Sequence, residues 1–354
     1  MKKWLYRAIL ITLPIICVLA AWFYLSFVPI VSQAEGMTYY LRPGLSKKAF
    51  IADLAQKNII SFPRLFSLYA YLQHQPHLKT GEYLFPKGST QVTVWQQVTE
   101  GKGLRYYPFT IIPGWTFVQL RQALAKADGL NHTTQSFTDA QIMQILEQPN
   151  MAAEGAFFPD TYYYSRGIAD TVILKKALIR MENKLYFAWQ QRITGLPYKN
   201  EYEALIAASL IEKEARLSSE RPIIAGVLIN RLQKNMLLQF DPTVIYGMGS
   251  QYTGKIHKAD LQADTPYNTY VHKGLPPTPI AMPSYASIEA ALHPEQHDYF
   301  YFVAKGDGSH QFSKTLLQHN HAVTVAATVK RKKEYFFNEV MIKQYIVQVW
   351  RYGS

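Results

Sequence analysis

Ala204-Leu-Ile-Ala-Ala-Ser-Leu-Ile-Glu-Lys-Glu214 is an apolar run that ends in two carboxylates. Residues 204–211 are apolar around nearly the whole circumference of a helix, which predicts that this helix is buried in the core of a domain. A Glu on its last turn would then be partly desolvated. Desolvation raises the pKa of a carboxyl group, and a general acid that works at neutral pH needs such a raised pKa. The stretch therefore predicts an enzyme site at the end of a buried helix.

Only one of the two carboxylates can face a given cleft. Glu212 and Glu214 are two residues apart and so point about 200° away from each other around a helix. Glu214 follows Ile206 and Leu210 on one line, and it is our predicted general acid, with Glu212 as the second choice. Glu212 would then pair with Arg216 at the surface. For either residue, the alternative is a solvated carboxylate at a helix end.

Several motifs flank this helix in a fixed order. They are Glu154-Gly-Ala-Phe-Phe-Pro-Asp160, Ser218 to Leu232, Leu238-Gln-Phe-Asp-Pro-Thr-Val-Ile-Tyr-Gly247, Tyr267-Asn-Thr-Tyr270, Gly274-Leu-Pro-Pro-Thr-Pro-Ile-Ala281 and Gly308-Ser-His-Gln-Phe312. Together they resemble the endolytic murein transglycosylases, single-pass membrane enzymes that cut the glycan strands of peptidoglycan. The resemblance covers residues 38–328.

The resemblance implies a reaction with a single catalytic carboxyl group. One Glu protonates the glycosidic oxygen and then deprotonates the 6-hydroxyl of the same muramic sugar, which gives a 1,6-anhydro ring without water. Glu214 matches the catalytic position next to the end of the helical run. Ala215 follows it, where many lysozyme-like sites have Ser or Thr.

Polar and aromatic side chains in the downstream motifs are the mixture expected of a saccharide groove. The predicted substrate-binding residues are Gln239, Asp241, Thr243, Tyr246, Tyr267, Asn268, Tyr270, His310 and Phe312. Asp241 is expected to have a positioning role, because Asp-Pro favours a turn and the Asp side chain can cap the backbone that follows. Core packing is the alternative for the aromatic residues, and a structural role is the alternative for His310.

The N-terminus predicts a membrane anchor. Lys2, Lys3 and Arg7 precede residues 8–31, which carry no charge and are long enough to span a bilayer. The positive cluster predicts a cytoplasmic N-terminus, with the remaining chain in the periplasm of a bacterial cell and anchored in its inner membrane. A cleaved signal peptide is the alternative. The only cysteine, Cys17, lies in this segment, so no disulfide or cysteine metal site is expected beyond it.

The composition fits a folded, exported protein. Hydrophobic residues make up 48% and charged residues 18% of the 354 residues, which excludes a disordered chain. The net charge of +12 would suit nucleic acid, but export argues against that partner. Anionic lipids or the carboxylates of peptidoglycan stem peptides suit the charge better. No metal or organic cofactor is implied.

The predicted fold class is α+β, with a small LysM-like module and a helix-rich, lysozyme-like catalytic domain that carries minor strands. Strands at residues 38–42 and 81–86 enclose two helices at residues 46–55 and 63–73. The LysM-like assignment comes from the resemblance, and a simple spacer is the alternative. The predicted order is a cytoplasmic end (1–7), a transmembrane helix (8–31), a linker (32–37), the LysM-like module (38–104), a connecting subdomain (105–154), the catalytic domain (155–329) and a basic tail (330–354).

Our prediction is an endolytic lytic transglycosylase that cleaves MurNAc-β-1,4-GlcNAc bonds. The resemblance also suggests that it works beside peptidoglycan synthases and ends nascent strands. A hydrolytic muramidase is the first alternative, with Glu214 as acid and Asp241 as second carboxylate. A membrane-anchored scaffold that binds glycan without catalysis is the second.

Overall fold

The structure is a computed structural model that describes residues 2–74 and 77–328. It divides into two compact units with interleaved boundaries. Unit 1 comprises Met1–Phe109, Ala123–Ser136 and Thr161–Ile173, and unit 2 comprises Thr110–Gln122, Phe137–Asp160 and Leu174–Ser354. Helices α5 (Phe117–Ala125) and α7 (Asp170–Gln190) contribute residues to both. The predicted connecting subdomain, 105–154, is thus divided between the two units. The predicted tail, 330–354, lies outside the described residues.

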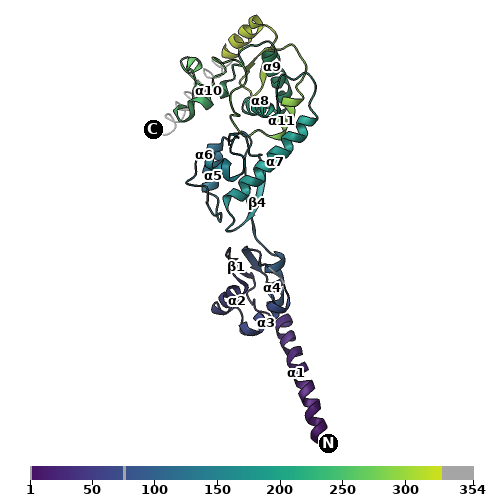
Figure 1. Ribbon diagram of the computed structural model, residues 1–354. Helices are drawn as coiled ribbons and strands as arrows, with labels where there is room; N and C mark the ends of the chain where they lie inside the picture. The colour runs from purple at the N-terminus through teal and green to yellow at the C-terminus, as the bar shows by residue number, and fades with distance from the viewer. Residues whose placement is uncertain (1, 75–76, 329–354) are drawn as a thin grey trace, which may run out of the picture. The chain divides into compact units, whose positions relative to one another are not determined.

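Unit 1 begins with the long apolar helix α1 (Lys2–Phe27), drawn in purple in Figure 1. Its segment Tyr6–Phe27 is long and apolar enough to cross a membrane. The helix is shorter than predicted because the residue before Pro29 disfavours helical geometry. The chain after it is paired with residues 88–90 of the same unit. Ile30 N–H donates to Ser89 O (2.8 Å), and Gly88 N–H donates to Val31 O (2.9 Å).

The rest of unit 1 contains the predicted strand, helix, helix, strand order. The elements are β1 (Met37–Leu41), α2 (Lys47–Gln56), α3 (Pro63–Leu72), β2 (Gly81–Phe85) and α4 (Gln91–Glu100). Ser46 caps α2 by accepting from Ala49 N–H, as expected, and Pro63 starts α3. Strands β1 and β2 pair antiparallel, and both helices pack on a core that includes Phe50, Phe66 and Trp95.

A second small sheet pairs β3 (Tyr106–Thr110) with β4 (Thr161–Ser165). Glu82 of β2 links it to the rest of unit 1, because its carboxylate accepts from Tyr107 OH (2.6 Å) and from Arg166 Nε (2.7 Å). The stretch Phe109-Thr-Ile-Ile-Pro-Gly114 predicts a strand that leads into a turn, whereas the observed strand lies earlier and ends at Thr110. It did not predict β4.

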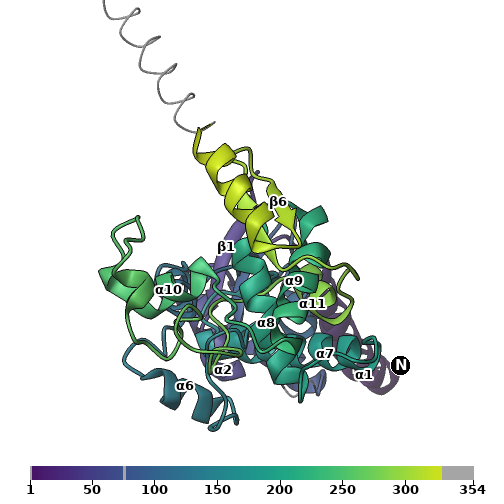
Figure 2. The same ribbon diagram turned by 90° about the horizontal axis from the view of Figure 1, so that it is seen from above.

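Unit 2 is built around α8 (Glu201–Glu214), whose residues 204–211 are all buried. Helices α9 (Arg221–Gln233), α10 (Asp241–Met248) and α11 (Tyr285–Leu292) pack against it or against each other (Figures 1 and 2). The shorter elements are α6 (Asp139–Ile145), the 3-10 turns Ser218–Glu220, Gly249–Gln251 and Asp260–Gln262, the β5 (Tyr301–Ala304) and β6 (His310–Ser313) hairpin, and a helix over residues 316–328.

A helix-rich α+β fold with small sheets and one apolar N-terminal helix is therefore confirmed. The sequence predicts helices over residues 170–192, 204–214 and 221–233, and α7, α8 and α9 lie there. Helices α10 and α11 were not predicted. The predicted turn at Asp241-Pro242 is instead the first turn of α10, where a proline is well tolerated.

Candidate active site

Glu214 ends α8, and its side chain is partly buried. Burial raises the pKa of this carboxyl group from its ordinary 4.5 to about 7, and the negative charge of Asp241 adds to the increase. Asn200 fixes the start of α8 by accepting from Glu203 N–H (3.0 Å). The carboxyl group is therefore held on a rigid helix and titrates close to neutral pH, as a general acid requires.

Asp241 and Tyr270 lie close to Glu214. Asp241 is the first residue of α10, and its carboxylate accepts a hydrogen bond from the Tyr270 hydroxyl. Burial is the main cause of a raised pKa at Tyr270, followed by this hydrogen bond and by the charges of Asp241 and Glu214. Tyr270 therefore keeps its proton and holds Asp241 in place. The structure thus brings together three of the predicted site residues.

Glu212 has a different environment. Its carboxylate accepts from Ser284 N–H (2.9 Å), from the Ser284 hydroxyl and from the Ser287 hydroxyl (2.7 Å). Arg221 lies 3.6 Å away. These contacts fix the N-terminus of α11 against α8. Glu212 makes them in place of the predicted surface pair between Glu212 and Arg216. Glu212 is therefore a structural carboxylate, which favours Glu214 as the acid.

Two predicted substrate contacts are buried. The Thr243 hydroxyl donates to Phe240 O (2.6 Å) and lies 2.9 Å from the Thr269 hydroxyl. The Asn268 amide donates to Ala263 O (2.7 Å), and its oxygen accepts from Tyr270 N–H (2.9 Å). Both side chains satisfy internal polar groups, so the prediction of direct sugar contact is corrected to a role in positioning α10 and Tyr270.

Gln239, Tyr246 and Tyr267 keep solvent exposure. Gln239 has a left-handed backbone (φ 53°), and its N–H donates to Thr269 O (3.0 Å). The rings of Tyr246 and Tyr267 meet edge to face at 4.7 Å. The Tyr267 hydroxyl lies 2.9 Å from the hydroxyl of Thr278, which belongs to the proline-rich motif. This arrangement leaves three predicted residues available to a ligand.

Glu154 is a buried carboxyl group beside the predicted site residue Tyr246, and sequence reasoning missed it. It is buried, and it accepts from Phe117 N–H (3.0 Å) and from the Tyr246 hydroxyl (3.1 Å). Burial raises its pKa to about 7 because it outweighs the stabilising hydrogen bonds. Glu154 opens one of the quoted motifs, but the local sequence gives no sign that it is buried or that it contacts α10.

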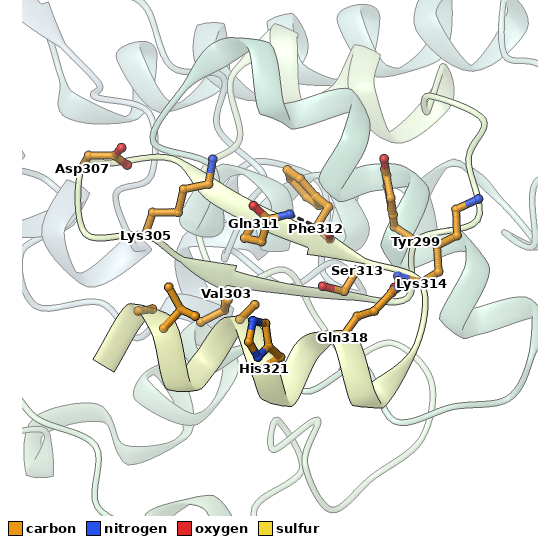
Figure 3. Close-up of a pocket in the computed structure, with 13 residues that line it drawn as sticks. Tyr299, Val303, Lys305, Asp307, Gln311, Phe312, Ser313, Lys314, Gln318 and His321 are labelled. Atoms are coloured by element: carbon orange, nitrogen blue, oxygen red, sulfur yellow. Dashed lines mark hydrogen bonds between the residues drawn. The ribbon is translucent and has the colours of Figure 1, made fainter. Parts of the chain in front are cut away.

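His310 and Phe312 lie on strand β6. His310 Nδ1 is 2.7 Å from Glu220, whose carboxylate also accepts from His310 N–H (2.8 Å), so the histidine is paired with Glu220 and not with Glu214. Phe312 lines a cavity of about 750 Å³ between the β5–β6 hairpin and residues 316–328 (Figure 3). Glu214 does not line this cavity, so the cavity is separate from the candidate site.

Across residues 2–74 and 77–328, no cluster of three or more His, Cys, Asp or Glu side chains is arranged to hold a metal ion.

Comparisons of this chain with family models, with named proteins and with solved structures all point to the same family. The YceG-like family model matches residues 39–325. The Bacillus subtilis endolytic murein transglycosylase is 32% identical over 311 residues, which cover 82% of this chain and 85% of that protein. The Streptococcus pneumoniae protein of the same name is 26% identical over 313 residues, 79% of this chain and 56% of that protein.

A solved structure of a YceG-like protein from Listeria monocytogenes has 30% sequence identity and a TM-score of 0.53. The match covers 82% of this chain and 99% of that one. These results confirm the resemblance that the sequence motifs indicated. The chain belongs to the YceG-like family.

Proposed function

We propose that this chain is a lytic murein transglycosylase that cleaves MurNAc-β-1,4-GlcNAc bonds within peptidoglycan glycan strands. The names of its relatives support the substrate and the reaction class. The observation that carries the proposal for this chain is Glu214, a carboxyl group at the end of a rigid buried helix with a pKa of about 7. About half of such groups are protonated at neutral pH, so one residue can serve as acid and then as base.

In the proposed reaction, protonated Glu214 gives its proton to the glycosidic oxygen as the bond from that oxygen to C1 of MurNAc breaks. The Glu214 carboxylate then takes the proton of the 6-hydroxyl of the same sugar while the hydroxyl oxygen bonds to C1. The product is a 1,6-anhydroMurNAc end, and Glu214 returns to its protonated form. No water is consumed.

Asp241 supports this reaction without acting as a nucleophile in it. Its Oδ1 atom accepts from the Tyr270 hydroxyl, and its charge lies close enough to raise the pKa of Glu214. A fixed negative charge there would also stabilise positive charge that develops at C1. In the alternative, a hydrolytic muramidase, Asp241 would have to direct water or attack the sugar itself.

Mass spectrometry of the products distinguishes these reactions. Purified glycan strands are incubated with the full chain in detergent as wild type, Glu214→Gln, Asp241→Asn and Glu289→Gln. Glu289 is an exposed glutamate on α11 and serves as the matched control. We expect anhydro ends from wild type and from Glu289→Gln, and none from Glu214→Gln.

Other products would contradict the proposal. Reducing ends one water heavier, lost in Asp241→Asn, would identify a muramidase. Intact strands after incubation with wild type would favour a scaffold that binds glycan without cleaving it.

We further propose that α1 anchors the chain in the inner membrane, with its N-terminus in the cytoplasm and both units in the periplasm. The positive residues before the apolar segment support this topology. Leu25 is buried in the core of unit 1, so cleavage of α1 as a signal peptide would remove a core residue. Unit 1 is proposed to bind glycan as a LysM-like module, and peptidoglycan synthases are the proposed partners during termination of nascent strands.

A further inference from the structure

Helix α1 packs against α4 within unit 1, and aromatic side chains of its last turns also contact α3. The Tyr24 ring meets the Phe62 ring edge to face at 5.1 Å, and the Trp22 and Tyr69 rings lie 6.3 Å apart. Leu25, which follows Tyr24, is only 3% exposed. Together with the hydrogen bonds of Ile30 and Val31 to residues 88–90, these contacts join α1 to the unit without a flexible linker.

This packing determines the depth of α3 relative to a bilayer. The apolar segment Tyr6–Phe27 has 22 residues. At 1.5 Å per residue it is about 33 Å long, close to the roughly 30 Å thickness of a hydrocarbon core. Trp22 precedes the end of this segment by five residues, or about 7 Å. Its partner Tyr69 must therefore lie at the level of the lipid headgroups or slightly deeper.

The outer face of α3 is apolar, unlike that of an ordinary surface helix. Its large side chains are exposed: Leu68 by 56%, Tyr71 by 76% and Leu72 by 59%, with Phe62 at its start exposed by 56%. The helix contains no acidic residue, and Arg64 is its only charge. Aromatic and aliphatic side chains next to a cation are typical of helices that lie in a membrane interface.

We propose that α3 is a second membrane contact, which lies on the outer surface of the bilayer with Phe62, Leu68, Tyr71 and Leu72 among the headgroups and the first acyl carbons. This proposal rests on the proposed anchoring by α1. Contact of α3 with lipid would hold unit 1 against the membrane surface, in addition to its attachment through α1. A glycan bound by unit 1 would then be one that lies close to the membrane.

Spin labels on single cysteines test the position of α3. The full chain with Cys17→Ala receives Leu68→Cys, Tyr71→Cys or, as control, Thr38→Cys, an exposed position on β1. Each labelled chain is reconstituted into vesicles of phosphatidylcholine and phosphatidylglycerol. Power saturation then compares collision of the label with oxygen, which is enriched in lipid, and with a nickel chelate, which stays in water.

We expect the labels at positions 68 and 71 to collide more with oxygen and less with nickel than the label at position 38. If all three labels are equally accessible to nickel in chains that float with the vesicles, α3 does not touch lipid and the proposal is wrong, while anchoring stands. If the chains do not float with vesicles, both the anchor and the α3 contact are refuted. Two label positions on α3 guard against misfolding caused by either substitution alone.

Discussion

Replacing Glu214 with glutamine is expected to stabilise unit 2 above neutral pH while abolishing turnover. Burial raises the pKa of Glu214 from 4.5 to about 7 in the folded chain. Below pH 4.5 the group is protonated in both the folded and the unfolded chain and contributes no pH dependence. Between pH 4.5 and 7, Glu214 ionises in the unfolded chain before it does so in the folded chain, so the free energy of unfolding falls as pH rises. Above pH 7 the group is charged in both states, and the folded chain bears the full cost of the buried charge.

The size of this cost follows from the pKa difference. At about 1.4 kcal/mol for each pKa unit, the increase at Glu214 corresponds to about 3 kcal/mol. Because the side chain keeps some solvent exposure, we expect about 2 kcal/mol to be recovered by the neutral amide above pH 8. Catalysis is lost in the same variant, because removal of a general acid lowers the rate by about 10²–10⁴-fold.

Thermal unfolding of the full chain near pH 5 and near pH 8.5 measures the effect. For a unit of this size, a gain of 2 kcal/mol corresponds to a rise of about 4–8 °C in Tm. We expect Glu214→Gln to raise Tm at the higher pH and to have little effect at the lower pH, with no such difference for Glu289→Gln. A Glu214→Gln effect that is the same at both pH values would refute the assignment of a buried, high-pKa carboxyl group.

Three further predictions concern other residues of unit 2. Asp241→Asn removes a nearby negative charge and so should lower the pKa of Glu214, moving the corresponding limb of the pH–rate profile to lower pH; an unmoved limb would contradict their coupling. Glu212→Gln should cost about 1–3 kcal/mol in denaturant unfolding, because it disturbs several hydrogen bonds, but it should still yield anhydro products. Tyr246→Phe should lower stability by about 1 kcal/mol through its lost bond to Glu154, and unchanged unfolding would argue against that contact.

The elements that the sequence predicts best are those with strong local signals. Helix α9 has the predicted bounds, and Ser46 and Pro63 mark the starts of α2 and α3 as expected. Helix α11 is short, and its first turn is stabilised by Glu212, which is distant in the sequence. Strand β4 likewise depends on pairing with β3, which no local pattern reveals.

The same limit applies to the candidate site. The partial burial of Glu214 was predictable because burial of α8 follows from a nearly continuous apolar run. The contact of Glu154 with Tyr246 joins residues 92 positions apart and was not predictable. Thr243 and Asn268 have side chains that suit sugar binding, yet they bond to backbone and hydroxyl groups inside unit 2. Residue type alone does not distinguish a polar group that binds ligand from one that satisfies the fold.

The two carboxylates at the end of α8 show why position on a helix separates structural from chemical roles. The helical twist turns Glu212 toward Ser284 and Ser287, whose N–H and hydroxyl groups stabilise a carboxylate. It turns Glu214 toward the negative charge of Asp241, and none of the described residues donates a hydrogen bond to it. Donors like those at Glu212 would lower the pKa of Glu214 and remove the protonated form that the proposed reaction needs. The absence of such donors is therefore a requirement of the mechanism, and its cost is the instability above neutral pH that Glu214→Gln should relieve.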